Sequence, residues 1–257
     1  MKKYLLAAAA LTALPAANAS ATTIIIYNWS IGANLIGGVT VTTPAISHGA
    51  IYINQFHYTG HDTNGNVFDQ LTNCVDLEHY VATGTYTLGS ISSRIPDLTK
   101  LRQMLTFIGT TTGIVAGDSG QQKNIDAAAM QLGIWEILYE GGNSNYNVTS
   151  GNFRSSFAGY VSQADFSAAQ TLANSWLGNT TSGLWTAPAG KTLGYLTNPN
   201  LQSQVYLRDL EQGEKGLGGG PGAVPEPASW ALMISGFGLV GWTSRRRRAG
   251  HMVRALA

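Results

Sequence analysis

The chain has 257 residues, of which 44% are hydrophobic, enough for one domain with a substantial core. Its formal net charge of +1 hides an uneven distribution, because the positive charges gather at the two ends. Between residues 22 and 224 there are 8 Lys and Arg against 13 Asp and Glu, a net charge of −5. This mildly acidic body argues against a nucleic-acid partner.

The first 21 residues have the pattern of a secretory signal peptide. Lys2 and Lys3 form a basic start, an apolar stretch follows from residue 4 to residue 14, and small residues allow cleavage after Ala19 or Ala21. The alternative, an ordinary buried N-terminal helix, fits this pattern less well. We therefore expect an exported protein whose mature chain begins near Ser20 or Thr22.

The next part of the chain is rich in β-branched and aromatic residues, which favours short strands. We expect strands at 22–29, 37–43, 50–58 and 85–92. The segment 62–69 (DTNGNVFD) has oxygen-bearing side chains as in a calcium loop, but its Asn-Gly pair is more typical of a hairpin turn. This part is predicted to be a β-structure with a hairpin at 62–69.

Three helical patterns follow. Residues 95–109 carry a one-sided apolar stripe of Leu98, Leu101, Leu105 and Ile108. Residues 125–139 are apolar almost all round, so this helix should be enclosed by other elements, and 165–178 form a third helix. Two strands are expected within 191–207. The sequence predicts an α+β fold over 22–210: a β-rich domain, sandwich-like or barrel-like, with inserted helices.

The C-terminal part has a different composition. Residues 211–224 are rich in glycine and predict a flexible linker. The 17 uncharged residues at 228–244, with Trp230 and Trp242 near their ends and Arg245, Arg246, Arg247 and Arg248 after them, predict one transmembrane helix with a cytoplasmic stop. The helix and the arginines belong to a segment at 225–249, which is followed by a tail at 250–257.

The residues VPEPASWALMISGFGLVGWTSRRRR (224–248) resemble the PEP-CTERM sorting signal of proteins exported by Gram-negative bacteria. The resemblance implies recognition by an exosortase-type membrane transpeptidase near Pro225, Glu226 and Pro227. It also implies transient anchoring in the membrane, removal of the tail, and delivery to the cell surface or extracellular matrix. The alternative is a plain tail anchor, in which these three residues are only a stiff linker.

Two residues of the body are unusual in their surroundings. Cys74 is the only cysteine, so in an exported protein it is either buried and inert or bonded to something other than sulfur. Gln131 lies in the most apolar helix, where leaving its amide unpaired costs about 1–3 kcal/mol. Each residue calls for a partner.

The segments FDQLTNCVDLEHY (68–80) and MQLGIWEI (130–137) resemble the two halves of the thioester domain of surface adhesins. In that family a cysteine on a strand acylates itself on the glutamine of a Gln-x-x-Ile-Trp helix. The resemblance implies a Cys74–Gln131 thioester that captures an amine or hydroxyl nucleophile on a partner. Two positions differ from the family pattern: Met130 stands where threonine is frequent, and Gly133 where alanine is usual.

Three functions remain open at this stage: a surface protein with a thioester, an inert matrix or envelope protein with a free thiol, and a secreted hydrolase using Cys74 with His79 or His57. The acidic neighbours Asp69, Asp76 and Glu78 should raise the pKa of Cys74, which weighs against the hydrolase. No enzyme activity and no cofactor are predicted. The histidines His48, His57, His61 and His79 match no paired zinc motif, so no metal is predicted.

Overall fold

The computed structural model describes residues 22–31, 35–142 and 144–210 of the chain. The predicted signal peptide, linker, transmembrane helix and tail all lie outside these residues. Within the described ranges, no helix is both long and apolar enough to cross a membrane.

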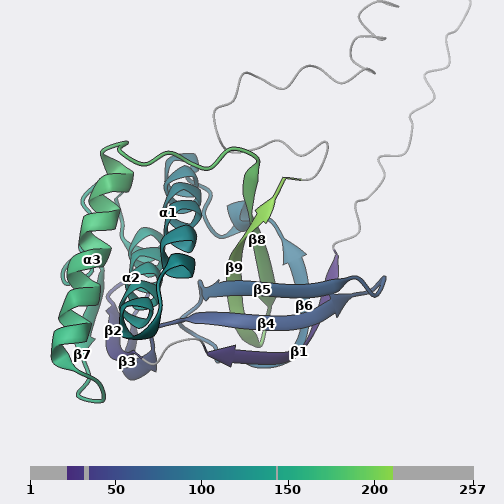
Figure 1. Cartoon of the computed structure of the whole chain (residues 1–257), viewed down its shortest axis with the longest axis horizontal. Coiled ribbons are helices and arrows are strands. Elements are labelled where there is room, and N and C mark those ends of the chain that lie inside the picture. The colour runs from purple at the N-terminus through teal and green to yellow at the C-terminus, as the bar shows by residue number, and fades with distance from the viewer. Residues whose placement is uncertain (1–21, 32–34, 143, 211–257) are drawn as a thin grey trace, which may run out of the picture. The chain divides into compact units, whose positions relative to one another are not determined.

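The first sheet is a closed six-stranded barrel, drawn on the right of Figure 1. All neighbouring strands in it are antiparallel. In β1, Ile24 and Ile26 are buried whereas Ile25 between them is half-buried, the alternation expected of a sheet with one face on the core. The strands, in barrel order, are β1 (Thr23–Ile31), β4 (Gln55–Asp62), β5 (Val67–Cys74), β9 (Leu201–Asp209), β8 (Lys191–Asn198) and β6 (Gly84–Gly89).

A second, three-stranded antiparallel sheet has the order β3 (Ile46–Tyr52), β2 (Ile36–Val41) and β7 (Phe153–Phe157). The expectation of one strand over 50–58 is wrong, because the chain leaves β3 after Tyr52 and enters the barrel as β4 at Gln55. Strand β7 was not predicted, since its centre is the polar run Arg154–Ser156. The chain therefore passes from the second sheet into the barrel near the middle of the predicted strand.

Three long helices accompany the sheets: α1 (Leu98–Gly117), α2 (Gly120–Tyr139) and α3 (Gln163–Thr181), with a short 3-10 turn, η1, at Ile91–Ser93. Helix α2 packs between α1 and α3 and also contacts β4 and β5 (Figure 1). Every residue of α2 from Ile125 to Ile137 is buried, as its all-round apolar sequence predicts. Helix α1 is longer than expected, and its first stripe residue, Leu98, is 59% exposed.

The described part of the chain is thus β-rich with three helices, consistent with the predicted α+β class, and the β-structure takes the barrel form. The hairpin at 62–69 is confirmed: β4 ends at Asp62 and β5 begins at Val67. The Asp62 carboxylate accepts hydrogen bonds from the backbone N–H groups of Asn64 and Asn66, and Gly65 has a φ of 84°, which glycine adopts without strain.

Candidate functional site

Cys74 and Gln131, predicted to meet, are in direct contact. The backbone N–H of Cys74 donates to Gln131 Oε1 at 2.9 Å, and Gln131 Nε2 donates to the Cys74 carbonyl oxygen at 2.8 Å. The exposed fractions are 1% for Cys74 and 0% for Gln131. The structure therefore places the glutamine amide flat against the backbone of the only cysteine, away from water.

The barrel explains why these backbone groups are available. The pairing of β4 with β5 ends where Gln55 lies opposite Asn73, so no β4 residue lies opposite Cys74. On the other side Cys74 lies opposite Gln204 of β9. The side chain of Gln131 supplies the partner that β4 does not provide, and it extends the ladder by one residue.

This pairing also accounts for a polar side chain within α2. The amide oxygen and one amide N–H are both bonded, so Gln131 does not carry the cost of an unpaired buried amide. A cross-link is thus not required to explain the presence of Gln131. What the geometry adds is the identity of its partner, which is the backbone of Cys74 itself.

The thiol of Cys74 lies inside a tight turn that follows β5. Its Sγ donates to the Asp76 carbonyl oxygen at 2.7 Å and accepts from the Asp76 N–H at 3.4 Å. Burial raises the pKa of the Cys74 thiol well above its ordinary value, and the charge of Asp76 adds to this rise, so the thiol stays protonated near neutral pH. Burial, rather than the acidic neighbours expected from the sequence, is the main cause.

Two of those acidic neighbours, Asp69 and Glu78, do not contribute to the raised pKa of Cys74. Asp69 is paired with His57 on the barrel surface, and Glu78 is exposed. A buried, protonated thiol is a poor turnover nucleophile, because the thiolate is the reactive form. The environment of Cys74 is therefore unfavourable for the cysteine hydrolase that the sequence left open.

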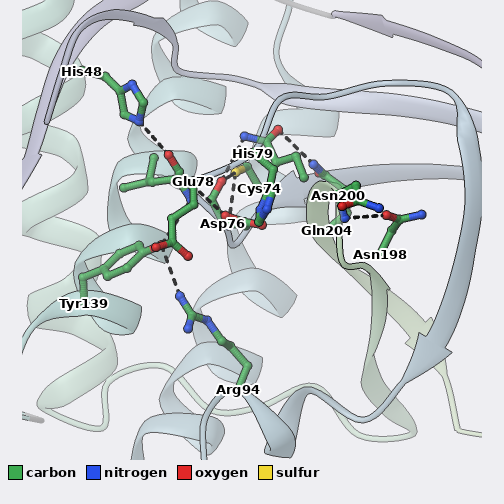
Figure 2. Close-up of polar contacts among 12 residues, drawn as sticks. His48, Cys74, Asp76, Glu78, His79, Arg94, Tyr139, Asn198, Asn200 and Gln204 are labelled. Atoms are coloured by element: carbon green, nitrogen blue, oxygen red, sulfur yellow. Dashed lines mark hydrogen bonds and ion pairs between the residues drawn. The ribbon is translucent and has the colours of Figure 1, made fainter. Parts of the chain in front are cut away.

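Helix α2 presents three residues, each four positions after the last, to the Cys74 segment. Gln131 bonds to the Cys74 backbone, and Trp135 lowers the pKa of the Cys74 thiol. The Tyr139 hydroxyl accepts a hydrogen bond from the Leu77 N–H at 3.2 Å. Arg94 donates to the same hydroxyl at 3.2 Å, which secures the turn from a second side (Figure 2). Residues at this spacing lie on one helix face.

Trp135 has a role that the sequence analysis missed. Its indole N–H is fully buried, has no oxygen or nitrogen partner, and lowers the pKa of the Cys74 thiol against the larger effect of burial. An indole N–H can only donate, so it favours a negatively charged sulfur. The spacing of Trp135 from Gln131 could have indicated this role, because both lie on the same face of the helix.

The two departures from the adhesin pattern have local explanations. A Cβ on Gly133 would lie 2.1 Å from Cζ of Phe107, a ring of α1 that is fully buried, so glycine is what this helix contact requires. Met130 is also fully buried, and its sulfur is 4.0 Å from Gln55 Nε2 at the start of β4. Neither residue prevents the contact between Cys74 and Gln131.

A cavity of about 270 Å³ opens beside the thiol. Its walls are largely apolar, and the residues in them that carry polar groups are two histidines, two tyrosines, Cys74, Trp135 and one glutamine. The lining residues are His48, Ala50, Ile51, Tyr52, Phe56, Cys74, Leu77, His79, Tyr80, Val81, Trp135 and Gln202. A small or narrow molecule inside this cavity would lie next to Cys74.

The histidines have separate partners. His79 Nδ1 lies 2.6 Å from Asp76 Oδ2, and His48 Nε2 lies 2.6 Å from the Leu77 carbonyl oxygen (Figure 2). His57 pairs with Asp69 and is not part of the cavity wall. His61 contacts the Asp62 carbonyl oxygen. Within the described ranges no three His, Cys, Asp or Glu side chains are grouped as metal ligands.

Comparison with known proteins bears on the other end of the chain. Residues 223–248 match the PEP-CTERM protein-sorting motif. The chain thus carries the signal of an exported protein that is anchored transiently in the membrane and processed by an exosortase. The matched range includes Pro225, Glu226 and Pro227. Neither the curated proteins nor the solved structures include one that matches this chain.

Proposed function

We propose that the protein is an exported cell-surface or matrix protein whose body forms a thioester between Cys74 and Gln131 and uses it to attach covalently to a partner. The observation that carries this proposal is the double hydrogen bond between the Gln131 amide and the Cys74 backbone, in a site closed to water. After the exosortase has processed the tail, the body presents this site outside a Gram-negative cell.

The chemistry of bond formation follows from the contacts. Cys74 Sγ attacks the Gln131 amide carbon, a carbon–sulfur bond forms, the carbon–nitrogen bond breaks, and the thiol proton leaves with the nitrogen as ammonia. Negative charge develops on Oε1, which already accepts the Cys74 N–H at 2.9 Å, the arrangement of an oxyanion-binding donor. The protonated thiol makes the reaction slow, but a bond that forms once per molecule tolerates a slow step.

When the thioester opens, Cys74 is the leaving group instead of the nucleophile. An amine or hydroxyl of the partner attacks the acyl carbon, and Cys74 leaves as a thiolate. The buried indole N–H of Trp135 lowers the pKa of the Cys74 thiol and has no other hydrogen-bond partner, which supports a role in stabilising that thiolate. The attachment is then an amide or ester to the partner, which outlasts any reversible affinity.

Intact mass of the purified mature body tests this proposal. The wild type should be lighter than its sequence by one ammonia, should resist thiol reagents, and should gain the mass of methylamine when this amine is added. Cys74→Ala and Gln131→Ala should each have the full mass of their sequences and add no methylamine. A wild type of full sequence mass would contradict the thioester.

A second candidate is an inert structural protein of the matrix or envelope. The observation in its favour is that Gln131 is already satisfied by the Cys74 backbone without any covalent bond. In that case Cys74 remains a thiol bonded to the Asp76 carbonyl oxygen. Denaturation separates the two candidates, because the inert protein should release one titratable thiol per chain and the cross-linked protein none.

The sorting signal gives a further prediction. Replacing Pro225, Glu226 and Pro227 together by alanine should abolish removal of the C-terminal tail in a host that has the exosortase, because the motif at 223–248 is then incomplete. The measurement is the size of the exported protein and its division between membrane and medium. Removal of the tail at the unchanged rate would leave only a plain tail anchor.

A further inference from the structure

The cavity beside Cys74 contains a histidine–carboxylate pair that the proposed bond formation does not use. His79 lies on the cavity wall, and its Nδ1 is 2.6 Å from Asp76 Oδ2. Since a carboxylate oxygen only accepts, Nδ1 carries the proton of a neutral His79. The other ring nitrogen, Nε2, then has a free lone pair. His79 and Cys74 both line the cavity.

Asp76 is itself held firmly in this position. It is 9% exposed, its Oδ1 accepts the Glu78 N–H at 2.7 Å, and its carbonyl oxygen accepts both the Cys74 thiol at 2.7 Å and Gln202 Nε2 at 3.0 Å. The residue that orients His79 is therefore the same residue that contacts the thiol. Orientation of a histidine by a buried carboxylate is the arrangement that serves general bases.

The second histidine of the cavity differs in its bonding. His48 Nε2 lies 2.6 Å from the Leu77 carbonyl oxygen, which can only accept, so this nitrogen must donate. In the described part of the chain, His48 forms no ion pair with a carboxylate. Of the two cavity histidines, only His79 combines a carboxylate partner with a ring nitrogen left to accept a proton.

We infer that His79, oriented by Asp76, is the general base for the nucleophile that opens the Cys74–Gln131 thioester. The nucleophile enters the cavity, which Cys74 lines, and its amine or hydroxyl attacks the Gln131 acyl carbon that is bonded to the Cys74 sulfur. The new carbon–nitrogen or carbon–oxygen bond forms as the carbon–sulfur bond breaks. The proton of the nucleophile passes to His79 Nε2 and then to the departing Cys74 sulfur, which ends as a thiol.

This inference rests on the proposed thioester and adds the residue that makes it reactive toward a partner. The cavity limits which nucleophiles can approach the thioester. Its volume of about 270 Å³ and its largely apolar wall fit a side chain or small molecule with an apolar stem and one nucleophilic end. Burial of that end in such a wall favours its uncharged, nucleophilic form over an ammonium ion.

The test uses the mature body and methylamine as the probe nucleophile. His79→Gln keeps a side-chain donor toward Asp76 but has no basic nitrogen, so the turn should stay in place. Wild type and variant are first compared by intact mass for the loss of ammonia. The rate of methylamine addition is then measured, and it should fall about 100-fold or more in His79→Gln, the usual contribution of a general base.

A matched control is His57→Gln, because His57 also pairs with an aspartate, Asp69, but does not line the cavity. Its rate should equal that of the wild type. Added imidazole should restore part of the methylamine addition in His79→Ala, which leaves room for it, and should change the His57→Gln rate little. Such rescue does not arise if His79 only supports the turn.

The possible outcomes separate the two proposals. A wild type without the loss of ammonia overturns both. A His79→Gln protein that carries the thioester and adds methylamine at the wild-type rate overturns the general base and leaves the thioester standing. A His79→Gln protein that folds but never loses ammonia assigns the base to bond formation, which also overturns the role inferred here.

Discussion

Cys74→Ala is expected to lower the free energy of unfolding by about 4 kcal/mol beyond the loss of the thiol's own contacts, if the thioester is present. The two residues are 57 positions apart, and a cross-link closing a loop of that size constrains the unfolded chain by about this amount in the chain-entropy model for disulfides. Without the bond, the substitution removes only the two hydrogen bonds between the thiol and the Asp76 backbone, a net loss of about 0.5–1.5 kcal/mol for each.

Gln131→Ala alone is a weaker test of whether the thioester is present. It leaves both the N–H and the carbonyl oxygen of Cys74 buried without a partner, and each such group costs about 1–3 kcal/mol even in a protein with no cross-link. Cys74→Ala keeps those backbone groups and their bonds to Gln131. It is therefore the cleaner measure of the covalent bond.

A double-mutant cycle completes the measurement. With the thioester, either substitution opens the same loop, so the effects of Cys74→Ala and Gln131→Ala should be far from additive, with a coupling of about 4 kcal/mol. Without it, the coupling should be small, because the alanine at 74 leaves the amide pairing intact. Denaturant unfolding of the four proteins supplies the values, and near-additivity would contradict the cross-link.

The sequence predicted the parts of this site that local pattern determines. The apolar surroundings of Gln131 indicated a helix that is buried all round, which the structure confirms, and Cys74 was placed beside it by resemblance. The hairpin at 62–69 followed from its Asn-Gly pair. Such features depend on neighbours in the chain, so they are visible without the tertiary structure.

Other parts depend on contacts that the sequence does not record. The ladder gap opposite Cys74 exists because β4 begins at Gln55, while the predicted strand at 50–58 gave no reason for a break there. The cavity requires the segment after Cys74 to fold back beside β3, so the pairing of His79 with Asp76 and their nearness to Trp135 could not be derived. Burial of the thiol, not nearby charge, determines its protonation.

Another residue that the sequence gave no reason to select is Glu136, a fully buried carboxyl in α2. Its Oε1 accepts the Asn147 N–H at 2.7 Å, but its Oε2 has no hydrogen-bond partner. Burial raises the pKa of Glu136 to about 8, and Glu140 adds to the rise, whereas the Asn147 bond and Lys100 oppose it. The folded protein therefore holds a proton that the unfolded chain releases near pH 4.5.

The direction of the pH dependence follows from this difference. Because the pKa is higher in the folded state, the stabilising effect of the proton is fully present below about pH 4.5. It is lost progressively as the pH rises to about 8, and stability no longer changes with this group above that value. At about 1.4 kcal/mol for each unit of pKa difference, the loss reaches at most about 5 kcal/mol.

Glu136→Gln should remove this dependence, since an amide of nearly the same shape stays neutral and can still accept the Asn147 N–H. We expect the variant to be several kcal/mol more stable than the wild type near pH 9 and similar to it near pH 5, by denaturant unfolding at both values. Glu78→Gln, at an exposed position two residues after Asp76, is the matched control and should follow the wild type at both. A Glu136→Gln protein that loses stability in parallel with the wild type between the two values would show that Glu136 is ionised in the folded state throughout. Oε2 of Glu136, which has no hydrogen-bond partner, would then need one to stabilise its charge.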